Sequence, residues 1–154
     1  MNTFTVQDIM NKEPCPDYTE EVVTELWKDK KSLTFKEVCD LDISVEDRIW
    51  IAVRLASRDT VVSWANYCAD EAKKHAAAAN AAPFAAHRTT LYAARAANAA
   101  YYAASYAANA ANYADYAALY AAYAAYYAAP NRIKARNEEL ERLLTKLVEM
   151  HEVE

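Results

Sequence analysis

Positive charge, a titratable ring and a phenol lie close together at one point of the chain. His87, Arg88, Tyr92 and Arg95 fall within a few residues of one another. In a helix, Arg88, Tyr92 and Arg95 follow the i, i+4, i+7 spacing and share one face. Arginine in an aromatic setting of low charge is suited to phosphate, which it binds through paired hydrogen bonds. The cluster predicts either a solvated helix start or a site for an anionic ligand.

Amides and further rings continue this set along the same stretch. A tyrosine ring can stack on a planar ligand, and stacking is worth roughly 1–3 kcal/mol per base. Asparagine can bind a base edge or a ribose, or it can fix the register of packed helices as a buried polar group does. Both interpretations apply to Asn98, Asn109, Asn112 and Asp115. The candidate ligand-binding residues are His87, Arg88, Tyr92, Arg95, Asn98, Tyr102 and Asn109.

An alanine-rich segment carries all of these residues. Between residues 76 and 129, 29 of 54 residues are alanine, and 10 of the chain's 12 tyrosines lie there. Only Arg88, Arg95 and Asp115 carry a full charge in it. Alanine has the best helix propensity because it loses no side-chain entropy. The composition therefore predicts helix throughout.

The tyrosines of this segment repeat at helical spacing. Seven tyrosines and Asn109 form one row, which we call the tyrosine ridge, and from Tyr102 to Tyr127 its positions step by four and three residues in alternation. That 3.5-residue period keeps one seam facing a partner helix. The remaining surface is expected to be a smooth face of alanine methyl groups. The predicted oligomer seam is Tyr106, Tyr113, Tyr116, Tyr120, Tyr123 and Tyr127.

The length of the segment raises a question of packing. Unbroken, residues 84–129 would span roughly 70 Å, whereas a compact chain of this length is only about 30–35 Å across. Either the helix kinks or breaks inside the run, or it packs along the same helix of other copies. We favour the second alternative, which predicts a homo-oligomer.

The predicted fold is all-α: an elongated, oligomeric helical bundle with long Ala/Tyr-rich helices and a smaller N-terminal helical cap. Residues 1–58 form the cap, and residues 59–129 form the long helices with a break or kink near Pro83. Residues 130–154 form an amphipathic helix in the same structural unit. No segment has the pattern of a strand.

Local signals place several helix boundaries. Asp17 or Thr19 can cap one helix and Ser44 another, and Thr34 with Glu37 forms a capping box. In the last helix, the residues expected to face inward are Ile133, Leu140, Leu143, Leu144, Leu147 and Val148.

Composition limits the partners and the compartment. The net charge is −5 and there is no basic run, which argues against a nucleic acid polymer. The absence of glycine excludes glycine-rich phosphate loops. The spacing of Cys15, Cys39 and Cys68 is not that of metal ligands, and we expect all three side chains to be buried in the fold. Their odd number suits a protein of the reducing cytoplasm. Charges and amides interrupt the alanine run, so we expect no membrane span and a cytoplasmic protein.

No set of residues predicts catalysis. His75, His87 and His151 are too scattered for a metal site. Glu71 and Asp115 are single acids without a visible partner. We therefore expect a protein that is not an enzyme, with no metal and no cofactor.

Two motifs carry a resemblance to a known group of proteins. They are DRIWIAVR and VVSWANYCADEA, followed by the alanine array and a charged terminal helix. The chain resembles a loose family of alanine-rich helical bacterial and phage proteins described as immunity proteins. The resemblance implies an all-helical fold and a defence or counter-defence setting. The matching residues are Asp47, Arg48, Trp50, Arg54, Trp64, Cys68 and Ala69.

These observations lead to one functional hypothesis and two alternatives. The first is a phage-type counter-defence protein that sequesters a small anionic, nucleotide-like immune signal without catalysis. The second is an immunity protein or inhibitor that binds and neutralises a toxin or defence enzyme. The third is a purely structural protein that assembles with itself. The expected partners are thus a second copy, a nucleotide-like ligand or a protein target, with no nucleic acid polymer and no membrane.

Overall fold

A computed structural model describes residues 2–78 and 83–154 of the chain. In these ranges the protein is 77% helical, which confirms the predicted all-α class. The elements in chain order are β1 (Thr3–Phe4), α1 (Val6–Met10), α2 (Glu20–Trp27), β2 (Leu33–Thr34), α3 (Phe35–Cys39), α4 (Val45–Leu55), α5 (Arg58–Ala78), α6 (Pro83–Ser105), the 3₁₀ turn η1 (Ala107–Asn109), α7 (Ala110–Ala128) and α8 (Arg132–Glu152).

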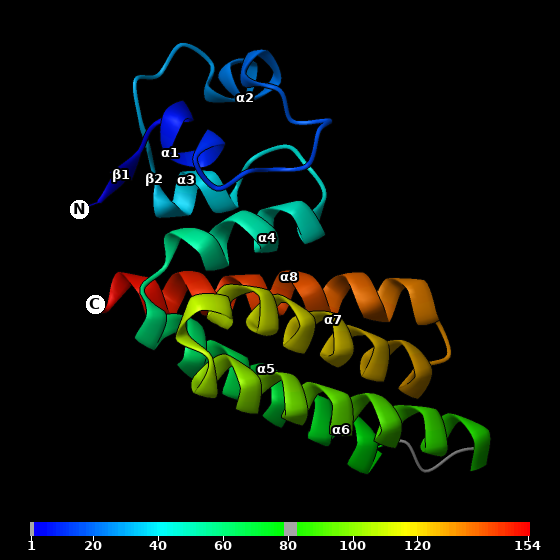
Figure 1. Cartoon of the computed structure of the whole chain (residues 1–154). Coiled ribbons are helices and arrows are strands. Elements are labelled where there is room, and N and C mark those ends of the chain that lie inside the picture. Colours follow the sequence, from blue (N-terminus) through cyan, green and yellow to red (C-terminus); the bar gives the residue numbers. More distant parts are fainter. Residues whose placement is uncertain (1, 79–82) are drawn as a thin grey trace.

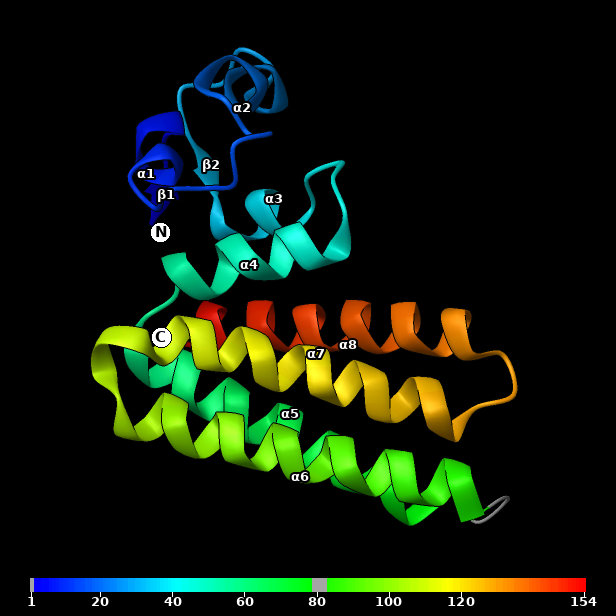
Figure 2. The ribbon, with the colours of Figure 1, turned by 45° about the vertical axis from the view of Figure 1, so that its right-hand side comes forward.

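The long helices α5 to α8 form a bundle, and the short N-terminal elements form a layer on one side of it (Figure 1). Helices α6 and α7 run antiparallel as a hairpin, and α5 packs against both. Helix α8 lies along α7, and α4 crosses over α7 and α8 to join the two layers (Figure 2). No helix in the described ranges is long and apolar enough to cross a membrane.

The tyrosine-rich run is broken in the middle. Helix α6 ends at Ser105, η1 follows, and α7 starts at Ala110. The run therefore folds back on itself, and the excess length that favoured packing between copies is absorbed within one chain. Self-association stays a prediction, but the length of the run no longer supports it. The other expected break lies between Ala78, where α5 ends, and Pro83, where α6 starts; residues 79–82 are outside the described residues.

Alanines, rather than tyrosines, form the buried seams between the long helices. On both α6 and α7 a set of buried alanines repeats at the same 3.5-residue period, each one position after a residue of the tyrosine ridge. The period was predicted correctly, and the alanine face, which was expected to let helix backbones approach closely, is buried between the helices. Small methyls let helix axes approach closely, whereas a tyrosine hydroxyl needs water or a partner. These buried alanines are Ala93, Ala96, Ala100, Ala103, Ala110, Ala114, Ala117, Ala121 and Ala124.

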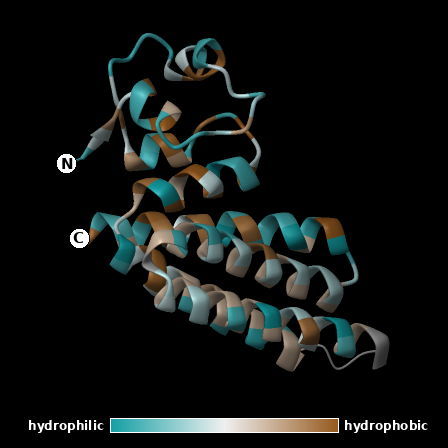
Figure 3. Cartoon of the chain, viewed as in Figure 1, coloured by the Kyte–Doolittle hydropathy of each residue, from teal (hydrophilic) through white to brown (hydrophobic). Residues whose placement is uncertain are grey.

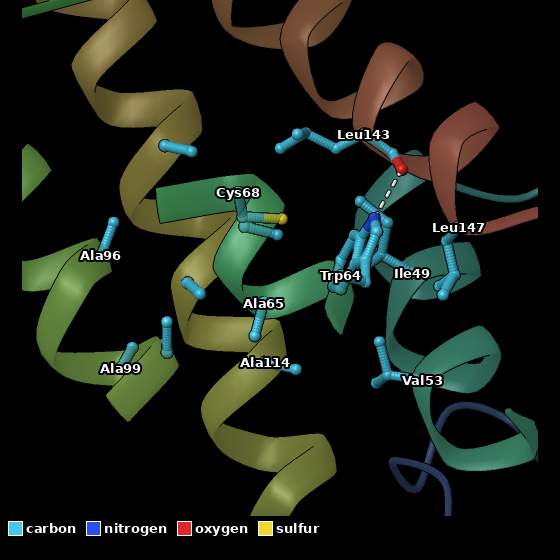
Figure 4. Packing of buried hydrophobic residues seen from close by; sticks show 14 of the residues in the cluster. Ile49, Val53, Trp64, Ala65, Cys68, Ala96, Ala99, Ala114, Leu143 and Leu147 are labelled. Atoms are coloured by element: carbon cyan, nitrogen blue, oxygen red, sulfur yellow. Dashed lines mark hydrogen bonds between the residues drawn. The ribbon is translucent and has the colours of Figure 1, made fainter. Parts of the chain in front are cut away.

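Larger side chains fill the space where α4, α5 and α8 meet. Trp64 of α5 is completely buried, and its Nε1 donates a hydrogen bond to the carbonyl of Leu143 at 2.7 Å. Ile49, Val53 and Leu147 lie around it (Figure 4). Hydrophobic and hydrophilic residues alternate along α8 (Figure 3), as predicted.

The inward face of α8 agrees with the prediction except at its start. Leu140, Leu143, Leu144 and Leu147 are buried, but Ile133 is 70% exposed. Ile133 lies in the first turn of α8.

The N-terminal layer starts its helices where the capping residues predicted them. Thr34 and Glu37 form the expected capping box, and Thr19 and Ser44 cap α2 and α4. The expectation of no strand was wrong, because β1 and β2 pair as a two-residue antiparallel ribbon. The layer has its own core: Ile9, Val23, Trp27, Leu33, Val38 and Ile51.

Candidate functional site

Four tyrosines from two helices meet on the outside of the α6–α7 hairpin. The ring of Tyr92 on α6 stacks with Tyr120, Tyr123 and Tyr127 of α7 at centroid distances of 6.2, 5.1 and 5.6 Å. The hairpin places these residues together because α6 and α7 are antiparallel, so the ridge of one helix lies beside the ridge of the other. Tyr123 stays 38% exposed, and the other three rings are half-buried.

Arginines border these rings on both sides. The guanidinium of Arg95 lies 5.3 Å from the Tyr92 ring, and that of Arg132 lies 5.5 Å from Tyr127. Arg136 lies 5.8 Å from Tyr123. Each such contact is worth roughly 0.5–1 kcal/mol at an exposed site. We call this set the tyrosine–arginine face: Tyr92, Tyr120, Tyr123, Tyr127, Arg95, Arg132 and Arg136.

The tyrosine–arginine face is locally positive in a protein of negative net charge. No acidic residue occurs between Glu71 and Asp115, so α6 carries only cationic and neutral side chains. One arginine of the face is already paired, because Arg136 contacts Glu46 of α4 at 2.7 Å. Arg95 and Arg132 are exposed. The face therefore combines planar aromatic surface with guanidinium groups that solvent can reach.

The structure brings together only part of the predicted ligand-binding set. Tyr92 and Arg95 belong to the tyrosine–arginine face, whereas His87 and Asn98 are exposed on α6. Arg88 is half-buried on the same helix.

Tyr102 and Asn109 lie at the opposite end of the hairpin. Tyr102 contacts Tyr106 and Tyr113 at centroid distances of 5.8 and 5.3 Å, and Tyr101 at 5.6 Å. Asn109 precedes α7 and is exposed, without a side-chain capping bond. The seven predicted residues therefore divide between two ends of the hairpin.

The predicted oligomer seam is also divided. Tyr120, Tyr123 and Tyr127 contact Tyr92, while Tyr106 and Tyr113 belong to the second group at the hairpin turn. Tyr116 is half exposed and contacts Tyr120 at 6.5 Å, so it adjoins the first group. These rings were predicted to contact another copy of the chain, and in the structure they contact other tyrosines of the same chain.

The polar residues at the start of α7 attach this helix to α4. Arg54 donates hydrogen bonds to the Asn112 side chain and to the carbonyl of Trp50, and its guanidinium lies 4.0 Å from the Trp50 ring. Burial raises the pKa of Asp115 to about 6, although the charge of Arg54 acts to lower it. Asn112 has a structural contact here, in line with its interpretation as a register residue.

A buried ion network joins α5 to α8, and little in the sequence pattern indicates it. Nη2 of Arg142 lies 2.7 Å from Glu71 and 2.5 Å from Glu139. The expectation that Glu71 is a single acid without a partner was therefore wrong. Burial acts to raise the pKa of Glu71, but hydrogen bonds and charges from Lys74 and Arg142 lower it overall. The only signal in the sequence is the i, i+3 spacing of Glu71 with Lys74 and of Glu139 with Arg142.

The described ranges contain no group of three or more His, Cys, Asp and Glu side chains placed to hold a metal ion. Cys39 and Cys68 are buried, and burial raises the pKa of the Cys39 thiol to about 12. Cys15 is exposed, which corrects the expectation that all three cysteines are buried.

The residues that carry the family resemblance have structural contacts. Asp47 accepts a hydrogen bond from the Tyr18 hydroxyl at 2.6 Å, and Arg48 forms two hydrogen bonds with Glu141 of α8. Trp64 is part of the core. These contacts hold the N-terminal layer and the bundle together, and none of these residues belongs to the tyrosine–arginine face.

A scan against protein-family models, a search of the curated proteins and a search of the solved structures each found no match. The function is therefore inferred from the chemistry of the site itself.

Proposed function

We propose that this chain is a non-enzymatic binding protein that sequesters a small, anionic, nucleotide-like ligand on the tyrosine–arginine face. One observation carries the proposal. The rings of Tyr92 and Tyr127 lie 5.6 Å apart, with Arg95 over the first and Arg132 over the second. A planar aromatic surface is thus bordered by two exposed cations.

The chemistry of this surface matches the two parts of a nucleotide. A base can stack on an exposed ring such as that of Tyr123, which contributes roughly 1–3 kcal/mol. A phosphate can accept paired hydrogen bonds from a guanidinium, an arrangement that lysine does not offer. Because the rings already pack on one another, little side-chain entropy is lost when a ligand binds.

The same features favour a small ligand over a polymer. A nucleic acid backbone needs a continuous row of cations, and the protein as a whole carries a charge of −5. The described cations of the face are three arginines, one of which is paired with Glu46. We propose capture of a signal in a counter-defence setting as the biological role, in keeping with the family resemblance.

Isothermal titration calorimetry with three probes tests the proposal. Adenosine monophosphate should bind, whereas adenosine lacks the phosphate and ribose 5-phosphate lacks the base, so each should bind at least tenfold more weakly. The double variant Arg95→Gln/Arg132→Gln should lose binding. Arg58→Gln is the matched control, because Arg58 is an exposed arginine at the start of α5.

The outcomes separate clearly. If ribose 5-phosphate binds as tightly as adenosine monophosphate, the rings play no part. If none of the four standard ribonucleoside monophosphates and no cyclic dinucleotide of adenine or guanine binds, the proposed ligand class is wrong.

A second candidate function rests on the other end of the hairpin. Tyr101, Tyr102 and Tyr106 are 68%, 40% and 53% exposed, and tyrosine is enriched at the centres of protein interfaces. This group suits an inhibitor that binds a toxin or defence enzyme, or a second copy of the chain. A Tyr101→Ser/Tyr106→Ser variant that loses a protein partner but keeps nucleotide binding would favour this function.

A further inference from the structure

A cavity of about 90 Å³ lies inside the N-terminal layer, between α1, α2, α3 and α4. Its inner wall consists of buried apolar side chains, among them Val23, Val38 and Ile51. Its outer wall consists of partly exposed side chains, among them Leu26 and Trp50. The cavity is therefore apolar inside and reaches the surface of the layer.

The loop before α2 closes one side of the cavity and is held in place at several points. The Tyr18 hydroxyl donates a hydrogen bond to Oδ2 of Asp47 at 2.6 Å, which ties this loop to α4. Pro14 and Pro16 lie in the same loop, and each proline ring fixes the φ angle of its residue. The wall is thus formed before a ligand arrives, which lowers the entropy cost of binding.

Asp47 has an unused acceptor at the cavity that it lines. Its Oδ2 accepts from Tyr18, whereas its Oδ1 accepts no hydrogen bond from a described residue and lies within reach of solvent. Asp47 also has no ion-pair partner among the described residues. The neighbouring cation, Arg48, is paired with Glu141 of α8. A ligand in the cavity can therefore approach a carboxylate whose charge is not compensated by the chain.

The surroundings of Asp47 are negative as well. Burial, the hydrogen bond to Asp47 and nearby negative charge, including that of Asp17, raise the pKa of Tyr18 to about 12. Residues 1–47 contain twelve Asp and Glu side chains against five lysines. Such a surface repels anions and attracts cations. An uncharged ligand without a donor group would leave Oδ1 unused.

We propose that this cavity binds a small alkylamine in its ammonium form. The alkyl group fills the apolar space, and the ammonium group donates a hydrogen bond to Oδ1 of Asp47. A cavity of about 150 Å³ accommodates a benzene ring, so the smaller volume here limits the alkyl group to about four carbons. This ligand differs in charge from the nucleotide proposed above and binds in a different layer of the fold.

Three probes that share an isobutyl group and differ in the head group test the proposal. They are isobutylammonium chloride, isobutanol and sodium isovalerate, with sodium chloride at equal ionic strength as the control for screening. Isobutylammonium should bind about tenfold or more tightly than isobutanol, because a hydrogen bond to a carboxylate is stronger when the donor is charged. Isovalerate should bind most weakly.

The indole N–H signals in ¹H–¹⁵N NMR spectra of the full chain locate the binding. Trp27 and Trp50 line the cavity, whereas Trp64, the third tryptophan of the chain, lies in the core of the bundle. Isobutylammonium should shift the signals of Trp27 and Trp50 saturably and leave that of Trp64 in place.

Two variants separate the head group from the alkyl group. Asp47→Asn keeps an oxygen that can accept from Tyr18 but removes the charge, so it should weaken binding of isobutylammonium about tenfold and that of isobutanol less than about twofold. Val23→Ile adds a methyl group to the inner wall and should weaken binding of both. Asp42→Asn changes an exposed acid that does not line the cavity, and it should affect neither.

Three results would overturn the proposal. One is binding of isobutanol or isovalerate within about twofold of isobutylammonium. Another is an Asp47→Asn variant that keeps the preference for the ammonium head group. The third is the absence of a shift at Trp27 and Trp50, or an equal shift at Trp64.

The test is independent of the tyrosine–arginine face. The Arg95→Gln/Arg132→Gln variant should bind isobutylammonium as the unmodified chain does, because neither arginine lines the cavity. Asp47→Asn should likewise leave binding of adenosine monophosphate unchanged.

Discussion

Tyr92 of α6 and Tyr127 of α7 lie nearly parallel, with ring planes 6° apart and centroids separated by 5.6 Å. They are 35 positions apart in the chain and meet because the helix breaks at η1 and turns back. Arg95 lies beside Tyr92 on the same helix, and α8, which follows α7, brings Arg132 next to Tyr127. The break in the helix is thus what creates the candidate site.

The alanine seams should tolerate no enlargement. Ala121 on α7 is completely buried between helices, so Ala121→Leu forces the helices apart and should destabilise the protein by about 1–3 kcal/mol. Ala94 is exposed on α6, and Ala94→Leu is expected to change stability by less than about 0.5 kcal/mol. Urea unfolding followed by circular dichroism measures both. Equal effects of the two variants would contradict an alanine-packed core.

The Glu71–Arg142–Glu139 network should respond strongly to loss of its cation. Arg142→Met leaves Glu71 with Lys74 as its remaining cation and removes the guanidinium from the buried carboxylate of Glu139, so it should cost about 1–3 kcal/mol near neutral pH. Lys134→Met breaks only the exposed pair with Glu138, and its cost should stay below about 1 kcal/mol.

The pH dependence gives the network a second test. The lowered pKa of Glu71 means that its contribution to stability is present above the unfolded pKa and is lost as pH falls. In Arg142→Met, protonation removes the unfavourable buried charge of the carboxylates. The difference in the free energy of unfolding between the variant and the unmodified chain should therefore become smaller as pH falls. A gap that stays constant from neutral to acidic pH would contradict this assignment.

Asp115 should weaken the fold when it ionises. Burial raises its pKa to about 6 from the usual 3.8, which means that the folded chain holds this proton more tightly than the unfolded chain. Stability is therefore lost as pH rises between these two values. Asp115→Asn should stabilise the protein by on the order of 2 kcal/mol at about pH 8 and give no gain below about pH 4. Thermal unfolding across this range measures the difference, and the exposed Asp59→Asn serves as control.

A left-handed residue at the end of α2 offers a simple gain in stability. Lys28 has φ 48° and ψ 53°, a conformation that costs a non-glycine residue roughly 1–2 kcal/mol. Lys28→Gly should stabilise the protein by about 0.5–1 kcal/mol. The same change at Lys73, exposed in the interior of α5, should destabilise it by about 1 kcal/mol. A loss of stability at position 28 would contradict the backbone geometry.

Local signals in the sequence predicted most helix boundaries correctly. Capping depends on residues within one turn, so Thr19, Thr34 and Ser44 could be recognised without any tertiary information. The helical period of the tyrosine ridge was correct for the same reason. The position of the break at η1 could not be predicted, because alanine favours helix there as strongly as it does along the rest of the run.

Only half of the candidate site could be found from the sequence. Tyr92 and Arg95 lie on one helix and were recognised by their spacing. Arg132 and Arg136 come from α8, and their place beside the rings depends on how α8 packs along α7. The partners of Glu71 were missed for the same reason, since Arg142 lies 71 positions away in the chain.

Native mass spectrometry tests the central claim most directly. The freshly purified chain and the Arg95→Gln/Arg132→Gln variant are each measured alone and after addition of adenosine monophosphate, and the spectra also report the number of copies. The proposed function predicts the mass of one nucleotide per 17.3 kDa chain on the unmodified protein, released on denaturation and absent from the variant. Equal nucleotide occupancy of the two proteins would contradict a site at the tyrosine–arginine face.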